Sequence, residues 1–127
     1  MTLRAIKTSA APGAVGPYSQ AIDTGGLVFL AGQIGLDPAT GQIVEGGIEA
    51  QAERALKNIV AVLEAAGLTM ADVVKTSCFL SDIANFEAFN AVYARFVADP
   101  PPARSTFAVA GLPKGGLIEI EAIASRS

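Results

Sequence analysis

The chain has 127 residues, which fits a single domain spanning residues 1–127, and 51% of its residues are apolar whereas 17% are charged. Its net charge of −3 gives no broad basic surface, so no nucleic-acid partner is expected. With one cysteine and no histidine, the chain lacks the residues for Ser-His-Asp or Cys-His catalysis and for a zinc site, so no metal is expected.

The first third of the chain predicts three strands. Leu3–Lys7 is a candidate first strand, and the second is expected to begin at Tyr18 and run to Asp23. The turn signal Gly25-Gly26 separates it from the run Leu27–Leu36, so these two segments are predicted to form a hairpin. Because residues 27–30 are all apolar, the third strand is expected to be buried on both faces.

The middle of the chain predicts two helices around one strand. Apolar residues recur at steps of three and four from Ile48 to Ala66, which is typical of an amphipathic helix, and Gly67 follows as a stop. Residues 72–80 are rich in β-branched side chains and are predicted to form a strand. A second helix is expected after Asp82 or Asn85 as its N-cap. It carries an aromatic stripe that is typical of core packing: Phe86, Phe89, Tyr93 and Phe96.

The last quarter places one cation and two carboxylates within two strand-like runs. Arg104 opens the run Arg104–Val109, and Glu119 and Glu121 fall on one face of the alternating run Leu117–Ala124. The connector between the runs is rich in Gly and Pro, so the runs are predicted to pair as a hairpin with the guanidinium and a carboxylate on one sheet face. The residues alone leave two interpretations open. One is a cross-strand ion pair that contributes little to stability, and the other is a small-molecule site in which Arg104 binds a carboxylate or phosphate.

These elements follow the order ββ(β)αβαββ, which predicts an α+β fold: a mixed sheet of five to six strands with two helices on one face. Several strands carry apolar residues on both sides, so the uncovered sheet face is expected to pack against another copy of the chain. No apolar run approaches the roughly 20 residues of a membrane helix, and the N-terminus has no apolar secretion segment. We therefore expect a cytoplasmic protein without a membrane partner.

Seven segments, in order and over nearly the whole chain, resemble the RidA (YjgF) family of small enamine/imine deaminases. They are GPYSQA (16–21), AGQIGLDPATG (31–41), QAERALKNIVAVLEAAG (51–67), VVKTSCFLSD (73–82), FNAVYARF (89–96), PARST (102–106) and IEIEAIA (118–124). The resemblance implies a fold similar to that of the bacillus-type chorismate mutase. It also implies a homotrimer whose sheets line an inner barrel, with one site at each subunit interface.

By the same resemblance, Arg104 corresponds to an arginine that binds the substrate carboxylate, and Glu119 to a glutamate that positions or activates water. Glu121 is the alternative to Glu119, because it lies two residues along on the same strand face. The substrate pocket implied by the resemblance contains, besides Arg104, the residues Tyr18, Gly32, Phe89, Asn90 and Thr106. Four of these residues also have a purely structural interpretation: a core aromatic for Tyr18, strand packing or a bulge for Gly32, and helix packing for Phe89 and Asn90.

Three positions depart from the pattern that the family resemblance suggests. Thr106 stands where many members have Cys, Ala31 where Ser is common, and Gly35 where Pro is common. The first two departures alter hydroxyl and thiol groups near the implied pocket and leave the carboxylate clamp intact. They bear on the substrate range and the rate rather than on the type of reaction.

The implied activity is the hydrolysis of reactive 2-imino acids, or their enamine tautomers, to 2-oxo acids and ammonia, with no cofactor. One rival interpretation is a non-catalytic trimer that senses small carboxylic acids through the same pocket. A second rival, a ribonuclease or translation inhibitor, is disfavoured by the acidic charge balance and the absence of histidine.

Overall fold

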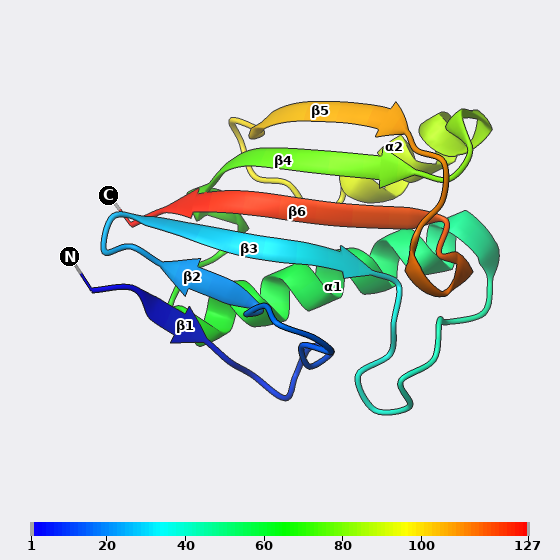
Figure 1. Cartoon of the computed structure of the whole chain (residues 1–127). Helices are drawn as coiled ribbons and strands as arrows, with labels where there is room; N and C mark the ends of the chain where they lie inside the picture. The colour runs from blue at the N-terminus through cyan, green and yellow to red at the C-terminus, as the bar shows by residue number, and fades with distance from the viewer. Residues whose placement is uncertain (1, 127) are drawn as a thin grey trace.

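The computed structural model describes residues 2–126, which form a six-stranded mixed sheet and two α-helices (Figure 1). The strands are β1 (Arg4–Ile6), β2 (Ala21–Asp23), β3 (Leu27–Ile34), β4 (Val73–Leu80), β5 (Ala103–Ala108) and β6 (Ile118–Ser125). The helices are α1 (Gly47–Ala65) and α2 (Phe86–Tyr93), and short 3₁₀ turns span Met70–Asp72 (η1), Ile83–Asn85 (η2) and Pro113–Gly115 (η3). The sheet order is β1-β2-β3-β6-β4-β5, and among these described strands β4 with β5 is the one parallel pair. The predicted α+β class, strand count and element order are therefore confirmed.

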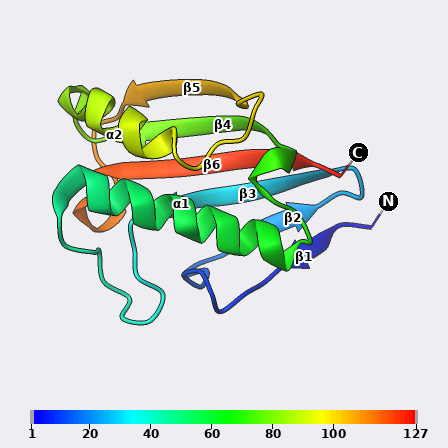
Figure 2. The ribbon, with the colours of Figure 1, turned by 180° about the vertical axis from the view of Figure 1, so that it is seen from behind.

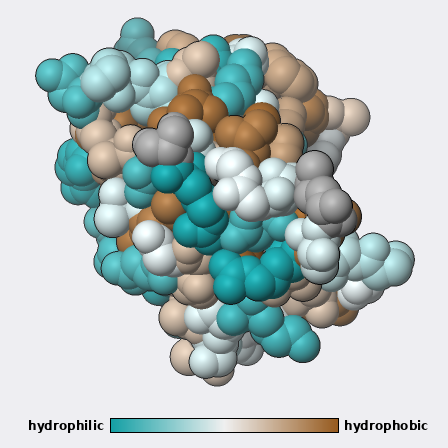
Figure 3. Space-filling view, turned by 90° about the vertical axis from the view of Figure 1, so that its left-hand side faces the viewer, coloured by the Kyte–Doolittle hydropathy of each residue, from teal (hydrophilic) through white to brown (hydrophobic). Residues whose placement is uncertain are grey.

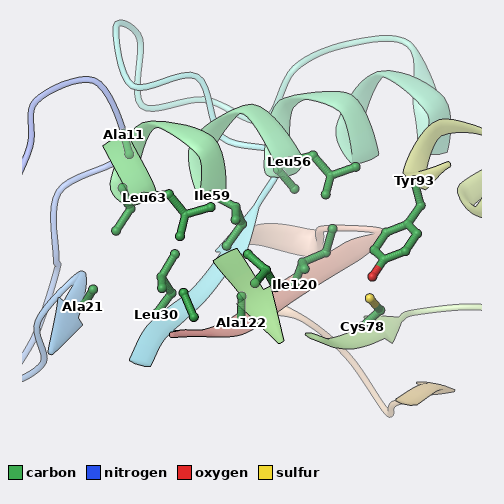
Figure 4. Packing of buried hydrophobic residues seen from close by; sticks show 14 of the residues in the cluster. Ala11, Ala21, Leu30, Leu56, Ile59, Leu63, Cys78, Tyr93, Ile120 and Ala122 are labelled. Carbon is green, nitrogen blue, oxygen red and sulfur yellow. The ribbon is translucent and has the colours of Figure 1, made fainter. Parts of the chain in front are cut away.

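Both helices cover the same face of the sheet, and the other face carries no helix (Figures 1 and 2). The core fills the layer between α1 and the sheet, where Leu56, Ile59 and Leu63 of the helix meet Leu30 and Ile120 of the strands (Figure 4). Each such fully buried aliphatic side chain contributes about 1.5–3 kcal/mol to stability. The sheet thus has one face covered by the helices, called the covered face, and one without helices, called the open face.

The third strand is buried on one face only, contrary to the prediction of two-sided burial. Val28 and Leu30 point toward the helices and are buried, whereas Leu27 and Phe29 are 40% and 42% exposed on the open face. On the same open face Phe107 is 49% exposed and its ring packs against Phe79 at a centroid distance of 5.3 Å. The open face therefore presents aromatic and aliphatic side chains to whatever lies against it.

Helix α1 agrees with the predicted helix to within one residue at each end. Its buried side recurs at helical spacing, and Gly67 adopts the left-handed φ of +76° that ends the helix. At the second helix, Asp82 caps the short turn η2 by accepting a hydrogen bond from the Ala84 N–H at 2.9 Å. Asn85 stands at the N-cap position of α2 itself but makes no side-chain cap bond, so of the two alternatives only Asp82 caps through its side chain, and it caps η2.

The predicted hairpin between the last two strands is wrong. β5 pairs only with β4, and β6 lies between β3 and β4, so β4 separates the two runs. The connector passes the end of β4, where the Val109 N–H donates to the Leu80 carbonyl and the Ser81 N–H donates to the Leu117 carbonyl. In its central position β6 buries its apolar face completely, which an edge hairpin would not achieve.

The second strand starts three residues later than predicted, at Ala21. Tyr18 lies in the preceding loop, where its N–H donates to the Gly16 carbonyl. The buried side chain of Gln20 bonds the backbone of residues 8–12, accepting from the Thr8 N–H and donating to the Pro12 carbonyl, each at 2.8 Å. These bonds join Gln20 to the loop of residues 8–12, so β2 begins only after Gln20.

A charged cluster ties the C-terminal strand to the β2–β3 turn, at the end of the molecule where both termini lie and where hydrophilic and hydrophobic side chains intermix (Figure 3). The Asp23 carboxylate accepts hydrogen bonds from Arg126 at 2.7 and 3.1 Å, from the Gly25 N–H at 2.8 Å and from Arg4 at 3.0 Å. The Arg126 bonds, and then the Gly25 and Arg4 bonds, hold the pKa of Asp23 well below its usual range.

We expect Asp23→Asn to lower the Tm at pH 7 by several degrees, because a neutral amide accepts these bonds more weakly. A depressed carboxyl pKa contributes stability above the ordinary aspartate pKa, and this contribution is lost as the pH falls toward the folded-state pKa. The Tm difference between wild type and variant should therefore narrow in acid. Thermal unfolding from pH 7 down to pH 3 measures it, and a gap that stays constant would contradict the assignment.

No helix within residues 2–126 is both long enough and apolar enough to cross a bilayer.

Candidate functional site

The residues predicted to form one site lie in two half-sites on opposite faces of the sheet. In the β4–β5 register Arg104 lies beside Thr76, which is buried beneath the helices, so Arg104 is on the helix-covered face. In the β4–β6 register Glu119 lies beside Phe79, between the buried residues Ile118 and Ile120, so Glu119 is on the open face. The alternation within each strand was predicted correctly, but the two side chains do not share a face.

The Arg104 half-site is built along one side of α2, from Phe86 to Tyr93. The Arg104 Nη1 donates to Asn90 Oδ1 at 2.7 Å, and its Cζ lies 4.8 Å from the Tyr93 ring centroid, 5.6 Å from that of Phe86 and 5.8 Å from that of Phe89. All three rings lie within 6 Å of the guanidinium carbon, close enough to attract the cation. The aromatic stripe of the second helix thus serves both the core and the arginine.

The guanidinium is not committed to an acidic group of its own chain. Within residues 2–126 Arg104 forms no ion pair, and its one hydrogen bond there is to Asn90. It borders a hollow of about 410 Å³ lined by Asn90, Tyr93, Ala94, Val97, Pro101 and Pro102. A half-buried, pre-oriented guanidinium with free donors is suited to a carboxylate or phosphate from outside the chain.

Two other predicted residues lie near Arg104 but do not line this hollow. Phe89 is fully buried, so its ring packs in the core as well as beneath the guanidinium. The Thr106 hydroxyl oxygen is buried without a hydrogen-bond partner among the described residues, and Thr106 lies beside Cys78 in the strand register. Burial raises the pKa of the Cys78 thiol to about 11, which makes it a poor nucleophile at neutral pH.

The Glu119 half-site is a second hollow, of about 490 Å³, at the open face. Its lining includes Tyr18, Ala31, Gly32 and Glu119. One cation, Lys114, also lines it, and the remaining lining residues are uncharged: Pro12, Gly13, Val15, Gln33, Ile34, Leu36 and Pro113. Partial burial, and then the negative charge of Glu121, raise the pKa of Glu119 above its ordinary value. A carboxylate with a raised pKa can accept a proton and return it near neutral pH.

Gly32 lies directly against the Glu119 carboxylate. It falls within the irregular stretch between Leu30 and Gln33, where the β3–β6 register shifts by a bulge. A Cβ built on Gly32 would overlap the carboxylate oxygen Glu119 Oε2. The glycine therefore sits in a bulge, as one interpretation held, and it also leaves space for the carboxylate.

Gly32→Ala is expected to displace the Glu119 carboxylate and leave the fold intact, because the overlap is with the flexible end of a side chain. We expect activity to fall about tenfold or more, by analogy with the cost of misplacing a catalytic group, whereas the Tm changes little. Gly26→Ala is the matched control, since a Cβ there meets no atom within 4 Å. Equal activity of the two variants in the assay described below would contradict this role.

Tyr18 is a pocket residue by position, not a core aromatic. It is 53% exposed, and its hydroxyl oxygen accepts a hydrogen bond from the Val15 N–H at 3.2 Å. The hydroxyl hydrogen has no acceptor within residues 2–126, so it can be donated to a ligand. Tyr18 also borders the hollow of about 690 Å³ under the loop of residues 13–20, so it forms the wall between two adjacent hollows.

Sequence reasoning missed two residues of the half-sites. Tyr93 was assigned to the core alone, although it contacts Arg104 and its hydroxyl bonds the Thr76 hydroxyl at 2.7 Å. Lys114 was passed over in the connector, although it lines the hollow that contains Glu119. The signal for Lys114 was available in the sequence, as a single cation within a Gly- and Pro-rich turn next to the IEIE run.

Within residues 2–126 no group of three or more His, Cys, Asp or Glu side chains is placed to hold a metal ion. Fold and site together define a small α+β protein with an arginine half-site on one sheet face and a glutamate half-site on the other. The chain belongs to the Endoribonuclease L-PSP family, also named RidA or YjgF, whose family model matches residues 8–126.

Curated relatives and solved structures agree with this assignment. The 2-iminobutanoate/2-iminopropanoate deaminase of Homo sapiens is 48% identical over 121 residues, which cover 95% of this chain and 88% of that protein. Protein DfrA of Myxococcus xanthus is 49% identical over 126 residues, covering 98% and 96%. The structure of RidA from an Antarctic Psychrobacter has 46% identity and a TM-score of 0.92, covering 96% and 98%. That of Escherichia coli TdcF with bound serine has 43% identity and a TM-score of 0.93, covering 98% and 99%.

Proposed function

We propose that this protein hydrolyses 2-imino acids, or their enamine tautomers, to 2-oxo acids and ammonia. The observation that carries the proposal is the uncommitted Arg104 guanidinium, oriented by Asn90 and three rings beside an open hollow. A relative 48% identical over most of the chain is named as a deaminase of 2-iminobutanoate and 2-iminopropanoate, two small imino acids with a carboxylate that such an arginine can bind.

A complete site in this proposal combines the Arg104 half-site of one copy with the Glu119 half-site of another. The two half-sites lie on opposite faces of the sheet, so one chain cannot direct both groups at one small molecule. The exposed aromatic residues of the open face, Phe29 and Phe107, support a second copy packed there. We propose a homotrimer, in which each of three interfaces carries one site.

The reaction needs positioning and one acid–base group, because an imine is already electrophilic. Arg104 binds the substrate carboxylate through two parallel hydrogen bonds and so places the C=N carbon beside Glu119. Glu119 accepts a proton from water as the water oxygen bonds to this carbon, and it delivers the proton to the nitrogen. Glu119 then accepts the hydroxyl proton of the resulting carbinolamine and passes a proton to its amino nitrogen as the C–N bond breaks, so imino acid and water become 2-oxo acid and ammonia.

A non-catalytic carboxylic-acid-binding protein is the second candidate. It is favoured by one observation: the structure of TdcF, 43% identical, holds serine, which has a carboxylate but no imine. Binding of a 2-oxo acid to Arg104 without any turnover of imino acids would support this candidate over the enzyme.

Ribonuclease activity is not proposed, although the family description contains the word endoribonuclease. The chain has no histidine, and its net charge of −3 offers no broad surface for a phosphate backbone.

The experiment is a measurement of oxo-acid release from 2-iminobutanoate that is generated in the cuvette by an amino-acid oxidase. Wild-type protein at catalytic concentration should accelerate release well above the spontaneous rate. A rate equal to that of the protein-free control would rule the proposal out.

A further inference from the structure

We propose that Lys114 selects imino acids whose side chain carries a second acidic group, such as the imines of glutamate and aspartate. This inference rests on the proposed function, because it names the substrate class of the same site. Lys114 lines the Glu119 half-site, whereas the residue proposed to bind the carboxylate common to all 2-imino acids is Arg104.

Lys114 is the only cation that lines the Glu119 half-site among the described residues. The other lining residues are uncharged except Glu119, and they include the apolar side chains of Val15, Ile34 and Leu36. Within residues 2–126 Lys114 forms no ion pair, so no acidic side chain there neutralises it. The lining of the hollow therefore includes the proposed catalytic carboxylate and one lysine that no acidic side chain of residues 2–126 pairs with.

Lys114 has a backbone conformation that is unfavourable for a lysine. Its φ of +57° makes it the only non-glycine residue with a left-handed backbone in the described chain. Such a conformation costs a bulky residue about 1–3 kcal/mol and suits glycine, which stands at the next two positions, 115 and 116. Lys114 is exposed and lines the hollow, where a bound ligand can reach its ammonium group.

A second acidic group is the chemistry that this cation fits. A simple imino acid has one carboxylate, which Arg104 of the facing copy binds in the proposed site. The ammonium of Lys114 then remains unmatched unless the substrate side chain ends in a carboxylate. An imino diacid satisfies both cations at once, and the apolar walls accommodate the methylene groups between its two carboxylates.

The test compares two acids with chains of five carbons that differ in one carboxylate: 2-oxoglutarate and 2-oxopentanoate. Their binding to wild type, Lys114→Gly and Lys114→Asn is measured by calorimetry, and kcat/KM is measured with the corresponding imines generated by an oxidase. Both substitutions tolerate the positive φ, so the turn keeps its shape. Lys57→Gln is the control, because it removes an exposed lysine of α1 whose one ion pair within residues 2–126 is with Glu53, at 3.9 Å.

We expect both Lys114 variants to lose about tenfold in affinity and in kcat/KM for the diacid, equivalent to about 1.4 kcal/mol, and to stay within twofold of wild type for the monoacid. Lys57→Gln should match wild type for both. Equal losses for the two acids, or no loss for either, would overturn the proposal. If the proposed function is wrong, wild type turns over no imine. The calorimetric comparison of the two oxo acids still tests whether Lys114 binds the second carboxylate.

Discussion

Arg104→Ala is expected to lower kcat/KM for 2-iminobutanoate about 100-fold or more. Each charge-assisted hydrogen bond to a carboxylate contributes about 1.5–3 kcal/mol, and the alanine variant loses two of them. The fold should persist, because within residues 2–126 the guanidinium forms no ion pair and one hydrogen bond, to Asn90, besides its contacts with the α2 rings. Oxo-acid release measures the loss, and circular dichroism checks the fold.

Two further variants separate charge from geometry at this position. Arg104→Lys keeps the charge but loses the planar fork, so it should retain only part of the activity. Arg4→Ala removes an exposed arginine from β1, at the opposite edge of the sheet, and should leave activity unchanged. If Arg104→Ala were as active as Arg4→Ala, Arg104 would not be the carboxylate ligand.

Glu119→Gln is expected to lower kcat about 100-fold or more and to change KM little, because the amide keeps the shape of the side chain but cannot carry a proton. The variant should be at least as stable as wild type at neutral pH. Burial raises the Glu119 pKa, so the folded state binds this proton more tightly than the unfolded state, and ionisation of the group above that pKa costs stability. A large loss of Tm would mean that Glu119 is a structural residue.

The pH profile gives a second measurement on Glu119. Activity requires the carboxylate form as base, so kcat/KM should rise through a pKa above the ordinary glutamate value. Because the charge of Glu121 contributes to the raised pKa, Glu121→Gln should move this limb of the profile to lower pH and leave the enzyme active. If Glu121→Gln were inactive and Glu119→Gln active, the roles of the two glutamates would be exchanged.

The elements that the sequence predicts well are those fixed by local pattern. Residues 48–66 show a helical period along their whole length, and the alternation in residues 117–124 assigns each side chain to a face. The pairing of β6 was mispredicted because adjacency in the chain favours a hairpin, whereas the strand gains more burial between β3 and β4. A pattern within one strand cannot show this choice.

The same limit applies to the site. The family resemblance identified Arg104, Asn90, Gly32 and Glu119, and the structure brings them into two pairs, with Arg104 against Asn90 and Gly32 against Glu119. That the pairs lie on opposite faces depends on the register of β4 with both of its neighbours, which is a property of long-range pairing. The sequence shows Lys114 as a cation in the turn before the IEIE run, but its strained backbone is visible only in three dimensions.

Mixing two inactive variants tests most directly whether the catalytic pair comes from different copies. Arg104→Ala and Glu119→Gln chains are unfolded together in equal amounts, refolded, and assayed beside each variant refolded alone. In a closed ring with random mixing, one interface in four receives an intact arginine from one copy and an intact glutamate from its neighbour, so about a quarter of wild-type activity should return. Activity no greater than that of the separate variants, in a mixture shown by native mass spectrometry to contain hybrid oligomers, would contradict a site shared between two copies.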